Sequence, residues 1–415
     1  MPPHVTVIHR VRGVDVPYLE RIDHNANAVT YVCARDLIDG IPRHAAAAVE
    51  LLEDMDNAAE AVHMLAARFG TPDRIVALHE FDLLTAARLR REFGIAGDSP
   101  DYVLPFRDKL VMGAIVATAG VPTPAFTHVG DIESITDFAA VHGFPLIVKP
   151  RLGAGSKDVI RLNSIDDCAT LPDLSAEPFL VQSFCPDEVG AVDGVWTGSA
   201  LGPWRASQYL GNCLEFANGG TTLGYVELDE PELLAALTNF VEAVLGALSA
   251  DVPTVFHLEF FLGRDGAAPR IQFLEVAARA TGGETTHMWR EVHGYDLLGA
   301  AVDIQLGRIP AADPLTDASV VGELLIHPQV TPPCTVVDVQ LHVPQQHAPY
   351  HVSVPEPGTT ITQTFGYAEI GAAFRFRGNS TVEVIDSLRR TAAGFRMDCV
   401  AYDPAVDPAV DPAVA

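Results

Sequence analysis

The sequence predicts an α/β protein, α+β in parts, that is built from more than one domain. From residue 4 to about residue 310, short apolar strands alternate with helix-like stretches, and after residue 320 the chain changes to short β-like runs separated by Pro and Gly. The chain has 415 residues, of which 48% are hydrophobic and 20% charged. This length and composition allow two or three domains, each with a substantial core.

The first expected domain covers residues 1–105. Apolar strands at 5–9, 28–34 and 74–79 flank a helix-like stretch over 45–69, a pattern typical of a small parallel sheet with helices on its faces. The domain is therefore expected to be Rossmann-like. No G-x-G-x-x-G follows the first strand, which argues against a dinucleotide-dependent oxidoreductase.

Later elements follow from their start and stop signals. The segment 107–120 reads as a helix that ends at Gly120, and residues 232–249 carry an apolar stripe at helical spacing. β-like runs after residue 320 and a helix at 380–395 predict a smaller C-terminal domain. The final thirteen residues, DPAVDPAVDPAVA (403–415), form a proline-rich repeat that we expect to be a disordered tail.

Charge and cysteine usage exclude several classes of partner. The net charge of −27 disfavours nucleic acid and anionic membranes. We see no apolar run long enough to span a bilayer and no secretory signal at the start, so a cytoplasmic enzyme is expected. The six cysteines lack C-x-x-C spacing, which predicts reduced thiols rather than a zinc ribbon or a disulfide framework.

The stretch FPLIVKPRLGAGSKDVIRL (144–162) places Lys149 at the end of an apolar strand. A lysine there loses hydration unless it reaches water or meets an anion. Three of the 27 basic residues are lysines, and all three, Lys109, Lys149 and Lys157, fall between residues 109 and 157. This clustering favours a site that needs compact ammonium groups, although drift in a lysine-poor chain is the alternative.

The stretch VFHLEFFLGRDGAAPRIQFLEV (255–276) predicts a β-hairpin. If the hairpin is centred near residue 267, Glu259 faces Glu275 and His257 faces Ala277. Carboxylates placed opposite each other repel and need a cation between them, and Mg²⁺ takes few protein carboxylates and completes its shell with water and phosphate. The alternative is a slipped register that leaves one carboxylate in solvent.

In order, the motifs DKLVM…AGVPTP, FPLIVKPRLGAGS, FLVQSFCPDEVGAVDG, HLEFFL and FLEVAARATGG resemble the ATP-grasp superfamily of carboxylate–amine and carboxylate–thiol ligases. The resemblance covers about residues 75–310, and the form EVAAR-x-x-GG is similar to bacilysin-type L-amino-acid ligases of natural-product pathways. It implies an ATP-grasp domain over 106–310 with a lid subdomain at about 121–190. A C-terminal β-rich domain over 311–402 would complete the module, and a homodimer is implied.

The resemblance also implies a role for each matching residue. Lys109 and Lys149 match phosphate-binding lysines, Glu259 and Glu275 match metal ligands, and Arg279 matches the arginine that contacts the transferred phosphoryl group and the substrate carboxylate. The family often has an asparagine where this chain has Ala277. The remaining matches are a flap over the phosphates (Gly153, Ala154, Gly155, Ser156) and an adenine-binding hinge (Gln182, Phe184, Cys185), where the family often has a glutamate at the Gln182 position. The family's ribose-binding glutamate would align with Val189, and Glu188, one residue away, is the candidate for this contact.

Substrate residues are harder to assign from sequence. Gly282, Gly283 and His287 are candidates beside Arg279, but His287 and Trp289 fit a packed core pair equally well. His257 reads either as a metal or phosphate contact or as a hydrogen-bonded structural histidine.

The resemblance implies an ATP- and Mg²⁺-dependent ligase, with Mn²⁺ as an alternative metal. Such an enzyme activates a carboxylate as an acyl phosphate and joins it to an amine. Two alternatives are an enzyme with a thiol or carrier-protein acceptor and a non-catalytic nucleotide-binding protein.

Overall fold

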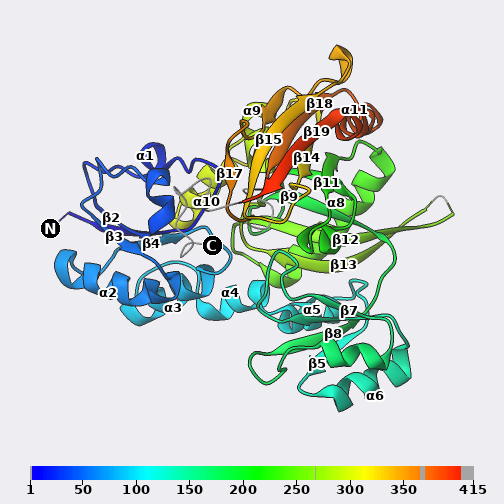
Figure 1. Cartoon of the computed structure of the whole chain (residues 1–415). Coiled ribbons are helices and arrows are strands. Elements are labelled where there is room, and N and C mark those ends of the chain that lie inside the picture. The colour runs from blue at the N-terminus through cyan, green and yellow to red at the C-terminus, as the bar shows by residue number, and fades with distance from the viewer. Residues whose placement is uncertain (1, 267, 365–369, 403–415) are drawn as a thin grey trace.

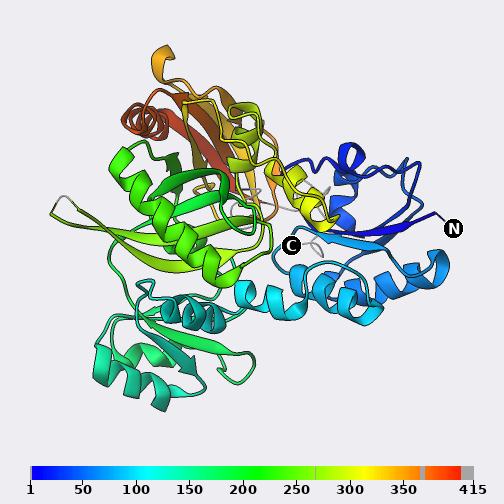
Figure 2. The same ribbon diagram turned by 180° about the vertical axis from the view of Figure 1, so that it is seen from behind.

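The structure is a computed structural model that describes residues 2–266, 268–364 and 370–402. The tail expected at 403–415 lies outside the described residues. The described strands form four sheets: one in an N-terminal body, one in the segment expected to be a lid, a large central sheet, and a small sheet near the C-terminal end of the described chain (Figures 1 and 2). We keep the name lid for the second of these.

The N-terminal sheet is parallel, with strand order β3-β2-β1-β4. One of its faces packs on helices α2 and α3, through Val62, Leu65 and Leu89 among others. Its other face packs on α10, which comes from much later in the chain (Figure 1). The bounds are β1 His4–His9, β2 Ala28–Ala34, β3 Ala48–Leu52, β4 Arg74–Ala77, α1 Tyr18–Arg21, α2 Ala58–Phe69, α3 Leu83–Phe93 and α10 Leu297–Gln305.

The prediction of a helix over residues 45–69 is wrong for the first half of this segment. The structure has strand β3 at Ala48–Leu52 and begins α2 only at Ala58. The alanines favour a helix locally, but the segment pairs in parallel with Thr30–Ala34 at the edge of the sheet. Pairing with a neighbouring strand outweighs the weak local preference for helix.

The lid is a four-stranded antiparallel sheet with order β5-β8-β6-β7, covered by helix α6. It lies at the bottom of Figures 1 and 2, beside the hairpin β12–β13. Its core includes Val129, Ile135, Leu146 and Val181. The bounds are β5 Phe126–Val129, α6 Ile132–His142, β6 Leu146–Pro150, β7 Ile160–Leu162 and β8 Phe179–Ser183.

The central sheet has eight strands in the order β13-β12-β9-β10-β11-β14-β18-β16. Every neighbouring pair is antiparallel, and three strands of the expected C-terminal domain extend it. The bounds are β9 Glu188–Trp196, β10 Leu201–Leu210, β11 Thr222–Glu227, β12 Thr254–Asp265, β13 Ala268–Ala277, β14 Val320–Ile326, β16 His351–Ser353 and β18 Ala372–Gly378.

The remaining elements cover this sheet or connect its strands. A small sheet with order β17-β15-β19 lies near helix α11, which packs on β14 and β18. The bounds are α4 Pro100–Arg107, α5 Lys109–Thr118, α7 Cys213–Ala217, α8 Pro231–Leu248, α9 Thr285–Glu291, α11 Thr381–Gly394, β15 Cys334–Leu341, β17 Thr360–Ile361 and β19 Phe395–Ala401, with short 3₁₀ turns at Arg35–Gly40, Met55–Asn57, Ile165–Thr170 and Gln345–His347.

Helix α8 follows the predicted apolar stripe. By length and composition alone, this helix could also cross a membrane. The sequence had indicated no apolar run of that length. Its stripe packs against β9 and β12 of the central sheet. The same length and apolarity therefore serve a core helix, and the buried positions are Leu233, Leu237, Phe240, Val241, Val244, Leu245 and Leu248.

The hairpin β12–β13 has the predicted register at its inner end. Glu259 pairs with Glu275, and His257 pairs with Ala277. Nearer the turn the pairing is offset by one residue, since Phe260 pairs with Phe273. A β-bulge at this step therefore brings the two glutamates opposite each other.

Candidate active site

One cavity of about 1110 Å³ is lined by residues from the N-terminal body, the lid and the central sheet. It brings together segments that are far apart in the sequence. The predicted site residues that line it are Lys109, Lys149, Gly153, Ala154, Gly155, Ser156, Gln182, Phe184, Cys185, Glu188, Glu259, Glu275, Arg279, Gly282 and Gly283.

Lys149 lies on β6 and is 5% exposed. Burial lowers its pKa to about 8; the carboxylates of Glu275 and Glu259 counter this effect, and Lys109 adds to it. The ammonium group therefore faces the cavity instead of reaching bulk water. Burial and Lys109 destabilise the charged form of Lys149 more than the two carboxylates stabilise it, so binding of a further anion beside the ammonium group would be favourable.

Lys109 begins helix α5, directly after the N-cap residue Asp108. Its Nζ donates to the carbonyl oxygen of Gly153 at 2.6 Å and lies 3.4 Å from Glu275 Oε2. This lysine thus ties the loop after β6 to the carboxylate pair. In that loop, Ser156 (φ 58°) and Asp158 (φ 57°) have left-handed backbone, which is uncommon outside glycine and recurs in ligand-binding loops.

The two glutamates already have partners within the chain. Lys109 and Lys149 outweigh the effect of burial on Glu275 and lower its pKa. Glu259 accepts a hydrogen bond from the Tyr209 hydroxyl at 3.1 Å and lies 3.5 Å from His257 Nε2. Repulsion between the carboxylates is therefore offset by cations of the chain itself.

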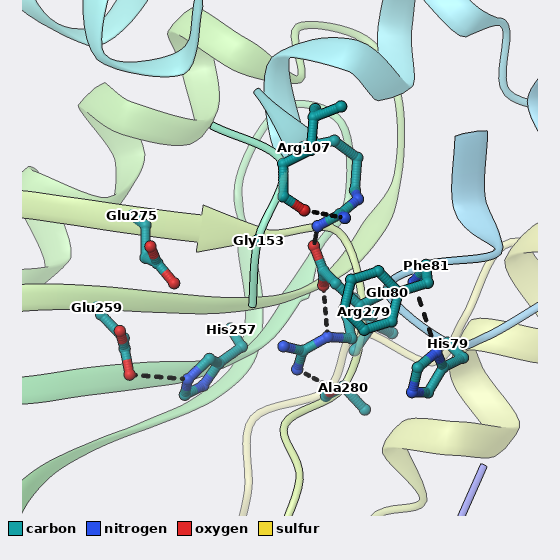
Figure 3. Close-up of polar contacts among 12 residues, drawn as sticks. His79, Glu80, Phe81, Arg107, Gly153, His257, Glu259, Glu275, Arg279 and Ala280 are labelled. Carbon is teal, nitrogen blue, oxygen red and sulfur yellow. Dashed lines mark hydrogen bonds and ion pairs between the residues drawn. The ribbon is translucent and has the colours of Figure 1, made fainter. Parts of the chain in front are cut away.

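His257 is hydrogen-bonded within the chain, as one of the two sequence interpretations predicted, and it also lines the cavity. Its Nδ1 lies 2.8 Å from Asp193 Oδ1, and Asp193 Oδ2 accepts from the Tyr225 hydroxyl at 2.7 Å. Burial lowers the pKa of His257, but Asp193 and Glu259 outweigh it and raise the pKa to about 10. The imidazolium thus holds Glu259 in place (Figure 3).

A buried cluster around Glu80, which the sequence reading left unassigned, holds Arg279 in position. Glu80 Oε2 accepts from Arg279 Nε at 2.6 Å, and Glu80 Oε1 pairs with Arg107 (Figure 3). Burial raises the pKa of Glu80, but Arg279, Arg107 and Lys109 outweigh it and lower the pKa to about 2. Glu80 lies in the turn after β4 and Arg107 ends α4, so no local pattern could join them to Arg279.

The expected adenine hinge lies at the end of β8. Gln182 is 7% exposed, and the backbone N–H of Phe184 donates to the Pro145 carbonyl at 3.2 Å. The Arg161 guanidinium lies 4.2 Å from the centre of the Phe184 ring. Glu188 is exposed at the start of β9 and lines the cavity.

The structure corrects the expectation for His287. Its Nε2 lies 2.9 Å from the Gly13 carbonyl oxygen, and it is not among the described residues that line the cavity. Trp289, 1% exposed, packs in the core, which bears out the core reading for this residue. Gly282 and Gly283 do line the cavity, but the N–H that follows them, on Glu284, binds the chain's own Glu323.

The donor set of Glu259 and Glu275 fits Mg²⁺ or Mn²⁺ bound together with phosphates. Both metals prefer hard oxygen ligands, and two carboxylates leave room for phosphate oxygens and water. Among the described residues, no group of three or more His, Cys, Asp and Glu side chains is placed to hold a metal by itself. Phosphate oxygens would complete the coordination shell.

Comparisons with known proteins agree on the fold. An L-amino acid ligase of Bacillus licheniformis matches with a TM-score of 0.70 at 17% identity, over 97% of this chain and 99% of that chain. The biotin carboxylase domain of Hydrogenobacter thermophilus 2-oxoglutarate carboxylase, described as a dimer with MgADP, matches with a TM-score of 0.67 at 15% identity over 96% and 91%. No family model matches the sequence. The chain shares the fold of these enzymes, which is the ATP-grasp fold.

A more particular resemblance comes from sequence. An L-arginine-specific L-amino acid ligase of Bacillus subtilis is 35% identical over 99 residues, which is 24% of each chain. The match thus spans about a quarter of that relative. In fold and in this stretch of sequence, the chain resembles L-amino acid ligases.

Proposed function

We propose that the chain is an ADP-forming carboxylate–amine ligase that acts on an amino acid or a related small acid. One observation carries the proposal. A single cavity is lined by three cationic side chains and by a pair of facing carboxylates. The cations are Lys109, Lys149 and Arg279, and the carboxylates are Glu259 and Glu275. Cations beside a carboxylate pair suit a nucleoside triphosphate with its metal.

In this proposal, Lys109 and Lys149 bind the phosphates of ATP, and the loop at 153–156 closes over them. The Gln182 side chain, the Phe184 carbonyl and the backbone of Cys185 receive adenine, because the Phe184 N–H is already bonded to Pro145. Glu188 binds the ribose. Glu259 and Glu275 hold Mg²⁺, which neutralises charge on the phosphate oxygens when bound.

The substrate carboxylate attacks the γ-phosphoryl group, so that an acyl phosphate forms and ADP leaves. Lys109, Lys149 and Arg279 stabilise the charge that spreads onto the transferred oxygens. Glu80 keeps the Arg279 guanidinium in a fixed orientation, so little reorganisation is needed during the reaction. An amine then attacks the acyl carbon and phosphate leaves, while the closed loop excludes water that would hydrolyse the intermediate.

The relatives support this reading. The matched structures include L-amino acid ligase and phosphoribosylglycinamide synthetase, and one neighbour holds MgADP. The expected homodimer and cytoplasmic location stay predictions, although the carboxylase neighbour is described as a dimer.

The test is substrate-dependent release of ADP. Purified protein is incubated with ATP, Mg²⁺ and pairs drawn from the common L-amino acids, ADP and phosphate are measured, and products are identified by mass spectrometry. Amide products formed with stoichiometric ADP support the proposal. A thioester formed only when a thiol is added favours the thiol-acceptor alternative, and nucleotide binding without turnover for any pair favours the non-catalytic one.

A further inference from the structure

A buried carboxyl group in the same cavity has no role in the chemistry described so far. Glu323 lies on β14, is 5% exposed and lines the cavity that also contains Lys149 and Arg279. A buried carboxyl group normally needs an ionic partner or a full set of hydrogen bonds. The contacts of Glu323 show which of its two oxygens has one.

One oxygen of Glu323 is held by the chain. Oε2 accepts from the Glu284 N–H at 2.6 Å and lies 3.5 Å from the Thr285 hydroxyl. Both donors lie at the start of α9, on its N-cap residue Glu284 and its first residue Thr285. They fix the orientation of the carboxyl group and leave Oε1 without a hydrogen bond from any described residue.

The nearest strand partner does not supply a cation. Arg375 pairs with Glu323 across β14 and β18, but its guanidinium donates to Glu284 and to Glu291, each at 2.5 Å. Among the described residues, no ion pair involves Glu323. Burial, with Glu284 and Asp193 nearby, raises the pKa of Glu323 to about 8. The site thus contains a carboxyl group that lacks a counter-charge.

Glycine keeps this carboxyl group accessible from the segment that carries Arg279. A Cβ atom at Gly283 would lie 2.7 Å from Glu323 Oε1, and the φ of +66° there also favours glycine. Thr286, 3% exposed, lines the cavity close by in the chain, and its hydroxyl has no hydrogen-bond partner among the described residues. A purely structural role, in which Glu323 supports the start of α9, accounts for the hydrogen bonds of its Oε2. It does not account for the free Oε1 or for the unpaired Thr286 hydroxyl.

Arg279 and Gly283 are four residues apart on one cavity-lining segment. Arg279 presents a cation and Gly283 gives access to the carboxyl group of Glu323, whose ionised form an adjacent ammonium group would stabilise. A zwitterion, with its carboxylate toward Arg279 and its ammonium group toward Glu323, matches this order of charges. A neutral or purely anionic acid would leave Glu323 without a partner.

We propose that Glu323 binds the ammonium group of the amino acid whose carboxylate is activated and sets the preference for amino acids over acids that lack this group. The inference rests on the proposed ligase function and assigns Glu323 a role in specificity, not in phosphoryl transfer.

The experiment compares each active amino acid from the ADP-release panel with its des-amino analogue, the same acid with hydrogen in place of the α-amino group. The measured quantity is the ratio of the two kcat/KM values. Wild type should favour the amino acid by at least about tenfold, since loss of a charged hydrogen-bond partner typically costs about 10- to 100-fold. In Glu323→Gln, which keeps an acceptor for the Glu284 N–H, the ratio should fall toward one.

The matched control is Glu227→Gln. Glu227 is a buried carboxyl group on β11, bonded to His293 at 2.8 Å, and it does not line the cavity, so the ratio should stay at the wild-type value. Gly283→Ala should reduce the ratio as Glu323→Gln does, because the added methyl group displaces Glu323. Because a ratio is measured within one preparation, partial unfolding of a variant cancels.

The outcomes separate the two proposals. Wild-type turnover with amino acids and an unchanged ratio in Glu323→Gln would overturn the role of Glu323 and leave the ligase function standing. If the wild type uses the des-amino acid as well as the amino acid, the proposed role of Glu323 is also overturned. This outcome needs no variant, so it holds even if Glu323→Gln fails to fold. Absence of turnover with every amino acid would overturn both proposals.

Discussion

Glu80→Gln should destabilise the protein and slow its reaction, because Glu80 is the buried partner of two arginines. The side chain of Glu80 is 8% exposed and that of Arg107 is 4% exposed, so solvent screens this pair little. The variant keeps the shape of the side chain and removes its charge. Arg107 and Arg279 then lose their shared counter-ion.

The size of the effect follows from the pKa of Glu80. A carboxyl group whose pKa falls from 4.5 to about 2 on folding contributes roughly 3 kcal/mol to the free energy of unfolding at pH 7, and breaking a buried ion pair costs about 3–5 kcal/mol. A depressed pKa contributes stability that is fully present above about pH 4.5 and is lost as the pH falls through about 2. At pH 4 the contribution should be about 2.5 kcal/mol.

The assay is urea unfolding of wild type and Glu80→Gln at pH 7 and pH 4, with ADP release measured at pH 7. The matched control is Glu53→Gln, which removes a carboxylate from an exposed pair with Arg35 in the same domain and should change little. Turnover of Glu80→Gln should fall at least about tenfold, because Arg279 loses the partner of its Nε. Equal stability of wild type and variant at pH 7, or a difference that grows at pH 4, would refute the reasoning.

Two further changes test the nucleotide site. Lys149→Ala should weaken ATP binding and nearly abolish turnover, and Lys149→Arg should recover little, because the planar guanidinium does not replace a compact ammonium group; unchanged ATP affinity by calorimetry would remove Lys149 from the site. Glu259→Gln and Glu275→Gln should each lower turnover by orders of magnitude and reduce the rise in melting temperature caused by Mg²⁺ and ATP. A full thermal shift in Glu275→Gln would argue against its role as a metal ligand.

The hairpin shows how far local sequence can specify a site. Alternation in the strands and a Gly–Asp turn predicted that Glu259 and Glu275 face each other, and they do. The turn alone, however, sets a register in which Phe260 pairs with Phe273, and continuing it would bring Glu259 opposite Leu274. The bulge corrects the offset. The residues of the turn do not indicate that bulge. The sequence therefore predicted the correct glutamate pairing but not the bulge that produces it.

Sequence by itself determined the features that depend on short spacing. These are the buried lysine on a strand, the glycine-rich loop after it, the apolar stripe of α8 and the order of motifs that resembles the ATP-grasp ligases. The first three, and each motif taken singly, are properties of fewer than about thirty consecutive residues, where strand and helix periodicity fixes which side chains share a face.

Only the tertiary structure decided which distant charges meet. Glu80 and Arg279 are 199 residues apart, and Glu323 lies 39 residues from the N–H that orients it. The strand β3 likewise exists because β2 offers it a partner, against the local preference of an alanine-rich segment for helix. A buried charge is stable only beside its partner. Where that partner comes from another domain, folding of the whole chain selects it, and no local pattern predicts it.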